Sequence, residues 1–199
     1  MTFVFNTKRW RGSCTTGDKV MQKLLGLACL AASLASIQGS TLQQLSLDDM
    51  IRQSMIVVRG QTQPTYSAVH GSVIYTHYRV QVSEVLKGSA TNQLDIAVPG
   101  GTSNGRKQIF AGVPALLSGQ DYLLFLWTSK SGLTQVIGLS QGLFAVTPNA
   151  SGQPTIQRAA ATERMLNSLG QAVSDSDIQM PLSDLRTRIQ WVLAGRSGP

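Results

Sequence analysis

The clearest hydrophobic pattern in this chain is a strict alternation over residues 74–82. One set of positions would face a core: Ile74, Thr76, Tyr78, Val80 and Val82. The other set would face away from it: Tyr75, His77, Arg79, Gln81 and Ser83. A period of two with β-branched and aromatic residues predicts a strand that is half buried on a sheet. The alternation slips at Glu84–Leu86, which predicts a β-bulge and a bend before the strand ends at Lys87-Gly88.

Further apolar runs between turn signals predict more strands on both sides of this one. We expect them at residues 55–60, 93–98, 107–113, 121–127, 134–139 and, as the last strand, 143–146. The polar segment 61–71, which contains Pro64, is predicted to be a loop, and Asn104-Gly105 a hairpin turn. Strands spaced this closely with no helices between them favour a mainly β fold, a small closed or partly open barrel with short flanking helices.

Two helices are predicted outside the strands. Ser46 can cap a helix that runs to about Ser54, with Leu47, Met50 and Ile51 on its inner face. The second helix spans residues 183–193, capped by Ser183 at its start and by Gly195 at its end. Its apolar stripe is expected to be Leu185, Ile189, Val192 and Leu193. This helix could be a lid on its own barrel or a docking helix for another protein.

The first forty residues are typical of a targeting segment. Met21-Gln22-Lys23 precedes the apolar run Leu24–Ile37, and small residues allow cleavage after Ala35 or Gly39. This layout predicts a secretory signal peptide that starts at Met21, after an over-extended 1–20, and a run too short for a comfortable membrane span. An uncleaved signal anchor is the alternative. We expect an exported protein, periplasmic or secreted.

These patterns divide the chain into four parts. Residues 1–39 are the leader, 40–148 the β-barrel domain with its leading helix, 149–181 a linker with a weak helix near 158–169, and 182–195 the C-terminal helix. Both cysteines, Cys14 and Cys29, fall in the leader, so the mature protein is expected to have no disulfide.

Charge argues against a nucleic-acid partner. The chain has a net charge of +7, but five of its basic residues precede residue 40. From Ser40 onward twelve Lys and Arg residues stand against nine Asp and Glu residues, and only Arg106-Lys107 are adjacent. A nucleic-acid-binding face usually gathers its basic residues in one place. We therefore expect a nucleic-acid-binding OB domain only if the protein is not exported.

The region Met55–Val146 carries a family resemblance. A strand ending in Val85-Leu86-Lys87-Gly88, a later Pro99-Gly100 turn, and the pattern Leu116/Leu117, Gly119, Tyr122, Leu123 resemble two groups of proteins. One is the OB-like barrel of the netrin and tissue-metalloproteinase-inhibitor class, and the other is a set of exported bacterial proteins of unknown function. The resemblance implies the barrel. It does not imply protease inhibition, because this region has no cysteine to bind the protease metal.

Several catalytic and cofactor motifs are incomplete. Gly100–Lys107 has a glycine-rich start, but its lysine is one place late and no helix follows, so no nucleotide is expected. His70 and His77 lie seven residues apart, which places them on opposite faces of a regular strand, so we expect a solvated His77 and no metal site or other cofactor. Glu84, Asp95 and Asp121 could serve an envelope hydrolase if they met in a cleft.

The best candidate for a binding surface is the outward face of the central strand. Tyr75, His77, Arg79 and Gln81 lie on it, and Trp127 is expected nearby. Aromatic, cationic and amide groups on a strand face are what OB-type domains use to hold ligands. The sequence favours an exported, non-enzymatic binding domain for a protein, peptide or glycan, and a plain solvent-facing sheet is the simplest alternative.

Overall fold

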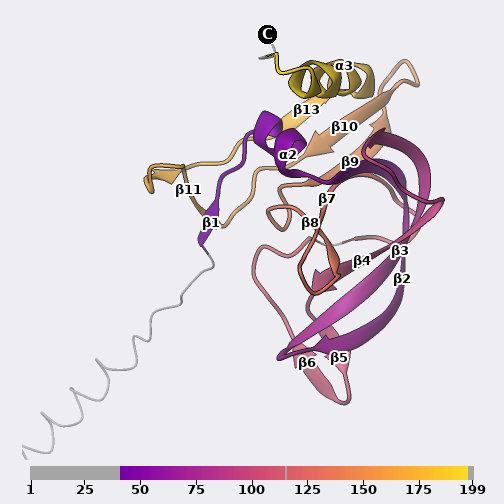
Figure 1. Ribbon diagram of the computed structural model, residues 1–199, viewed down its shortest axis with the longest axis vertical. Helices are drawn as coiled ribbons and strands as arrows, with labels where there is room; N and C mark the ends of the chain where they lie inside the picture. The colour runs from indigo at the N-terminus through magenta and orange to yellow at the C-terminus, as the bar shows by residue number, and fades with distance from the viewer. Residues whose placement is uncertain (1–40, 115, 197–199) are drawn as a thin grey trace, which may run out of the picture. The chain divides into compact units, whose positions relative to one another are not determined.

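The computed structural model describes residues 41–114 and 116–196 (Figure 1). The expected leader, its cleavage sites and the proposed start at Met21 lie outside the described residues. Within them the chain is mainly β, as predicted, with two helices. Neither of these helices has the length and apolar character that a membrane-crossing helix needs.

The helices are α2 (Leu47–Gln53) and α3 (Leu182–Leu193). The strands are β1 (Thr41–Gln43), β2 (Ile56–His70), β3 (Val73–Lys87), β4 (Gln93–Pro99), β5 (Gly101–Ser103), β6 (Arg106–Gln108), β7 (Asp121–Thr128), β8 (Thr134–Val136), β9 (Leu143–Pro148), β10 (Pro154–Arg158), β11 (Arg164–Leu166), β12 (Ala172–Val173) and β13 (Ile178–Pro181).

The main sheet has the order β13-β10-β9-β7-β2-β3-β4, with β8 paired to β7, and its ladders are antiparallel. Among the described residues β4 and β13 are its two edges, so the sheet does not close and the closed barrel is a wrong prediction. The sheet is nevertheless strongly curved. Val136 of β8 lies in one buried cluster with Ile96 and Val98 of β4, although no ladder joins these two strands.

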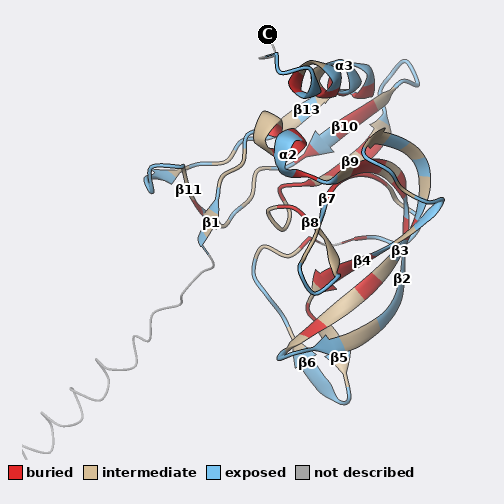
Figure 2. Ribbon diagram, viewed as in Figure 1, coloured by how far each residue is buried: buried red, intermediate tan, exposed pale blue. Residues whose placement is uncertain are grey.

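Two buried clusters lie on opposite faces of the main sheet (Figure 2). The sheet-enclosed cluster consists of Val58, Val80, Ile96, Val98, Leu116, Tyr122, Leu124, Leu126 and Val136. The helix-covered cluster consists of Leu47, Met50, Ile51, Val57, Leu123, Phe125, Ile137, Phe144, Val146, Ile156, Leu182, Leu185, Ile189 and Val192. Alternate residues of β7 enter each cluster, which explains why this strand is a continuous apolar run in the sequence.

The strands β2 and β3 form one long hairpin. The predicted loop over residues 61–71 is wrong, because β2 continues through it and pairs with β3 as far as His70 and Val73. Three register shifts bend the hairpin, and the shift between Val57 and Val58 leaves Leu86 as the extra residue. This confirms the predicted bulge. It turns Leu86 toward the helix-covered cluster, whereas Val82 packs against the sheet-enclosed one.

The region after β9 is richer in strands than its sequence indicates. The prediction that residues 143–146 form the last strand is wrong, because β10 and β13 extend the main sheet and β11 and β12 join β1 in a separate small sheet. The expected weak helix at 158–169 is absent as well. Arg158, at the end of β10, instead forms a buried ion pair with Asp175, with Nη1 and Oδ2 3.0 Å apart.

The helix α3 packs on the chain's own core, which is the lid arrangement of the two considered from sequence. Its buried residues Leu182, Leu185, Ile189 and Val192 belong to the helix-covered cluster. Leu193 is half exposed and does not continue the stripe. Ser183 lies inside the helix and is not its cap, while Gly195, with a φ of 73°, follows the helix end as predicted.

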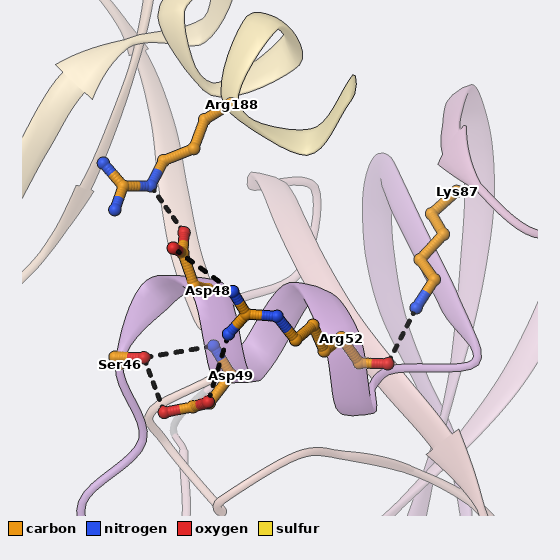
Figure 3. A network of polar contacts seen from close by, with 6 residues as sticks. All are labelled: Ser46, Asp48, Asp49, Arg52, Lys87 and Arg188. Atoms are coloured by element: carbon orange, nitrogen blue, oxygen red, sulfur yellow. Dashed lines mark hydrogen bonds and ion pairs between the residues drawn. The ribbon is translucent and has the colours of Figure 1, made fainter. Parts of the chain in front are cut away.

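The helix α2 begins after Ser46, as the sequence predicts, and three sets of polar contacts fix its position (Figure 3). The hydroxyl of Ser46 accepts a hydrogen bond from the Asp49 amide, at 3.1 Å. Arg188 of α3 donates to the carboxylate of Asp48, at 2.8 Å. At the other end the ammonium of Lys87 donates to the carbonyl oxygens of Ile51, Arg52 and Ser54. The last residue of β3 thereby satisfies carbonyls that a short helix leaves unpaired.

Candidate functional site

The outward residues of β2, β3 and β4 line up in rows across the sheet. The pairing sets Gln61 beside Gln81 and Gln81 beside Gln93, and in the next row Gln63, Arg79 and Asp95 are neighbours. Tyr66 and His77 form the following pair. Because directly paired residues point to the same side of a sheet, these side chains share the face opposite the sheet-enclosed cluster. The structure thus gathers His77, Arg79 and Gln81 with residues of two other strands.

An aromatic platform lies at one end of this face. The rings of Tyr66 and His77 stack with centroids 4.3 Å apart and planes 8° apart. At the edge of the imidazole ring, Nδ1 of His77 lies 2.7 Å from Oδ2 of Asp95. Tyr66 is 55 % exposed while His77 is only 8 % exposed. The prediction of a solvated His77 is therefore wrong, because Tyr66 covers this ring.

A local irregularity places Tyr66 over the histidine. Thr65 is the extra residue where the β2–β3 register shifts, and its hydroxyl donates to the carbonyl oxygen of His77, at 3.0 Å. Pro64, which precedes it, has no amide hydrogen to give to the ladder. Pro64 contributed to the prediction of a loop in this segment. In the structure, the bulge at Thr65 changes the direction of β2 and turns Tyr66 onto His77.

Two hollows adjoin the platform. The first has a volume of about 400 Å³ and is lined by Thr65, Tyr66, Arg79, Gln93, Leu94 and Asp95. The second has a volume of about 430 Å³ and is lined by Arg59, Gln61, Gln81, Ser83, Glu84 and Asp121. A hydrogen bond of 3.1 Å from Nε2 of Gln93 to Oε1 of Gln81 joins their linings. We name the continuous surface the polar track: Arg59, Gln61, Gln81, Gln93, Arg79, Asp95 and Tyr66.

The three carboxylates considered from sequence do not form one cluster. Asp121 accepts two hydrogen bonds from Arg59, at 2.9 and 2.7 Å, and its Oδ1 is buried without a hydrogen-bond partner. Glu84 accepts two from Arg186 of α3, at 2.7 and 2.8 Å. The hydrogen bonds from Arg186 lower the pKa of Glu84. Asp95 lines the other hollow and contacts His77, which does not line it. Glu84 and Asp121 thus border the same hollow, and each accepts hydrogen bonds from an arginine.

Trp127 and Tyr75 do not belong to the polar track. Trp127 lines a separate hollow of about 400 Å³ with Leu42, Leu45, Gln53, Ile137 and others, and it lines neither of the two hollows of the polar track. Tyr75 lies further along β3, where its ring meets His70 edge-on with centroids 6.4 Å apart. Of the five residues proposed from sequence, the structure brings His77, Arg79 and Gln81 together.

Other candidate chemistry has no support in the described residues. The segment Gly100–Lys107 forms the β5–β6 hairpin around Asn104 and Gly105, both with positive φ, which confirms the predicted turn and leaves no helix N-terminus for a phosphate. No group of three or more His, Cys, Asp or Glu side chains lies together there in a way that could hold a metal ion.

Comparison with models of known protein families, with curated proteins and with solved structures found no match for this chain. The resemblance to OB-like exported proteins therefore remains a prediction. What the described residues provide for a functional assignment is the geometry of the polar track.

Proposed function

We propose that this protein is an exported, non-enzymatic binding domain with a partly open, OB-like sheet, and that its polar track holds a glycan chain of the bacterial envelope. The observation that carries the proposal is Tyr66, an exposed ring held flat by the buried His77 beneath it. A rigid aromatic face suits the apolar C–H face of a sugar ring, because stacking there costs little conformational entropy.

The groups around the ring suit the edges of a sugar. Arg79 and Gln93 offer N–H donors and Asp95 an acceptor beside Tyr66, and glutamine amides, which both donate and accept, continue along the track. A few placed polar groups next to an apolar face are typical of small-molecule and saccharide sites. The two adjoining hollows favour a ligand with several units over a single sugar.

The charge of the track favours a neutral polymer over nucleic acid. Arg59 is paired with Asp121, and the linings of the two hollows contain three carboxylates, Glu84, Asp95 and Asp121, against two guanidinium groups, Arg59 and Arg79. Phosphate backbones are bound by gathered basic residues, which this face lacks.

The proposal that the protein is exported rests on the apolar run Leu24–Ile37. It also rests on the cysteines, since both precede the end of that run.

A hydrolase is the second candidate, since Glu84 and Asp121 border one hollow. Glycoside hydrolysis requires an acid that is protonated near neutral pH, and therefore one with a raised pKa. The hydrogen bonds from Arg186 act in the opposite direction on Glu84. Binding without cleavage is the function that this arrangement supports better.

The test is calorimetric titration of the purified chain with oligosaccharide fragments of the cell wall and with neutral glucans. Tyr66→Ala is expected to weaken binding about tenfold, the usual effect of removing an aromatic anchor, while Tyr66→Phe keeps the ring and most of the affinity. Leu169→Ala, which removes an even more exposed side chain elsewhere, is the control. Equal affinity of Tyr66→Ala and wild type would refute the proposal. If the protein is saturated by peptides and by no sugar, the ligand of the track is a peptide and not a glycan. Release of shorter sugars during the titration would favour the hydrolase.

A further inference from the structure

The turn of the β2–β3 hairpin and the end of the β5–β6 hairpin lie together at one end of the main sheet (Figure 1). Gln108, the last residue of β6, joins them with its side chain. Its Nε2 donates to the carbonyl oxygen of Ser72, at 3.0 Å, and its Oε1 accepts from the Ile74 amide, at 2.6 Å. The Gly100 amide also donates to the Ile74 carbonyl, at 2.7 Å. The two hairpins are thus fixed to each other by backbone and side-chain hydrogen bonds.

Large apolar side chains are exposed at this junction. Val69, which pairs with Ile74, is 49 % exposed, and Ile109, which directly follows Gln108, is 79 % exposed. Phe110 is 39 % exposed, and a Cβ on Gly100 would lie 3.8 Å from its ring. Three large apolar side chains are thus exposed on neighbouring segments, and apolar residues that gather on a surface can take part in an interaction.

Basic residues flank the patch, and acidic ones are missing from its segments. Arg106 and Lys107 lie on β6 and are exposed, and neither has an ion-pair partner among the described residues. Residues 60–83 and 96–120 contain no Asp or Glu. The acids that the structure places beside these segments are Asp95, which contacts His77 further along β3, and Glu163, whose side chain a Cβ on Gly112 would meet at 3.1 Å. We call Val69, Arg106, Lys107, Ile109 and Phe110 the hairpin tip.

We propose that the hairpin tip binds the surface of an anionic lipid bilayer. Exposed apolar side chains can enter the boundary between headgroups and acyl chains, and neighbouring cations are attracted to anionic headgroups. A lipid surface with anionic headgroups is favoured over a protein partner because the exposed cations Arg106 and Lys107 lie beside the apolar side chains and residues 96–120 carry no acid. This proposal is independent of the polar track.

The test is cosedimentation of the full chain with vesicles of phosphatidylcholine alone and of phosphatidylcholine mixed with phosphatidylglycerol. We expect binding to the mixed vesicles only, and weaker binding as salt increases. Lys107→Gln should reduce the partition coefficient about fivefold, and Ile109→Ser by a similar factor, since each removes one contribution of about 1 kcal/mol or more. The controls are Lys130→Gln and Leu169→Ser, which change equally exposed residues outside the tip.

All variants carry the same N-terminal segment, so differences between them report on the tip alone. Their thermal midpoints should match the wild type, because the altered side chains are exposed. The proposal is overturned if the tip variants and the controls bind equally, if phosphatidylcholine alone binds as well, or if inorganic phosphate displaces the protein as effectively as anionic vesicles. It is also overturned if Ile109→Ser dissociates a dimer seen by sedimentation velocity and leaves vesicle binding unchanged.

Discussion

The face of the main sheet that bears the polar track is the same face that α2 and α3 cover further along. On β2, Val57 enters the helix-covered cluster, while Arg59 and Gln61, on the same side of the strand, line an open hollow. Where helices cover the sheet, its residues are apolar and fully buried. Beyond the helices, the residues on this face of the sheet are amides and ion-paired side chains. The comparison teaches that one sheet surface is divided into a covered apolar part and an open polar part, and it is the open part that we propose for binding.

Two side chains near the end of β3 mark the boundary between these parts. Glu84 reaches Arg186 of α3, and Lys87 reaches the C-terminal carbonyls of α2. Both contacts join the bent end of the strand to a helix that lies far from it in sequence. Variants in the helix-covered part should therefore lose stability, whereas variants in the polar track should lose affinity for the ligand.

The largest expected difference is between Leu185→Ala and Arg79→Ala. Leu185 is fully buried between α3 and the sheet, so its truncation should lower the free energy of unfolding by about 3 kcal/mol. Arg79 is exposed on the track, so its loss should change stability by less than about 0.5 kcal/mol. Urea unfolding followed by tryptophan fluorescence measures both. Similar losses for the two variants would contradict the division of the face.

An intermediate effect is expected for Lys87→Met. Methionine keeps an apolar chain of similar length but offers no donor to the three carbonyls at the end of α2. We expect a loss of about 1–2 kcal/mol in the free energy of unfolding, because charge-assisted hydrogen bonds are removed at a partly exposed helix end. Hydrogen exchange should show the loss as faster exchange of the last α2 amides. Lys130→Met, on an exposed turn, is the matched control.

The smallest effect, and the one with a pH signature, is expected for Glu84→Gln. Hydrogen bonds from Arg186 lower the pKa of Glu84 below its unfolded value. The pair's contribution is therefore fully present above the unfolded pKa and is lost as pH falls through the folded one. At neutral pH the variant should be less stable by about 0.5–1 kcal/mol, and the difference should vanish as the pH falls below the lowered pKa of folded Glu84.

Unfolding curves recorded across that pH range would measure the difference directly. Glu163→Gln is the control, since Glu163 has no ion-pair partner among the described residues. A Glu84→Gln penalty that stays constant from neutral to acid pH would show that the Arg186 contact does not depend on the charge of Glu84.

Local patterns predicted the elements whose own residues determine them. The cap at Ser46, the alternation of β3, the apolar run of β7 and the Asn104-Gly105 turn are all found in the structure. In each case the information lies within a few consecutive residues: a side chain that accepts an amide hydrogen bond, a period of two, or a dipeptide that tolerates positive φ.

The platform of the candidate site could not be predicted, because a distant contact determines it. Tyr66 lies in a polar segment next to Pro64, which in isolation is typical of a loop, and only pairing with β3 makes it a strand. The burial of His77 follows from that pairing and is invisible in its own strand. Strands β10 to β13 were missed for a related reason, since runs of two to five residues are too short to show a period. A signal was present in the alternation of Gly60 and Thr62, which are buried, with Gln61 and Gln63, which are exposed.

The parallel pairing of β1 with β11 has a consequence for the order in which the molecule is completed. Thr41 is the partner of Arg164, and the carboxamide of Gln141 holds the backbone of Gln43 and Leu45 at 2.9 and 2.8 Å. A chain that emerges N-terminus first can form the β2–β3 hairpin once residue 87 is available, because hairpin contacts are local. Its first strand must wait for partners synthesised more than a hundred residues later. Residues 41–43 are therefore expected to be among the last to find their β partners.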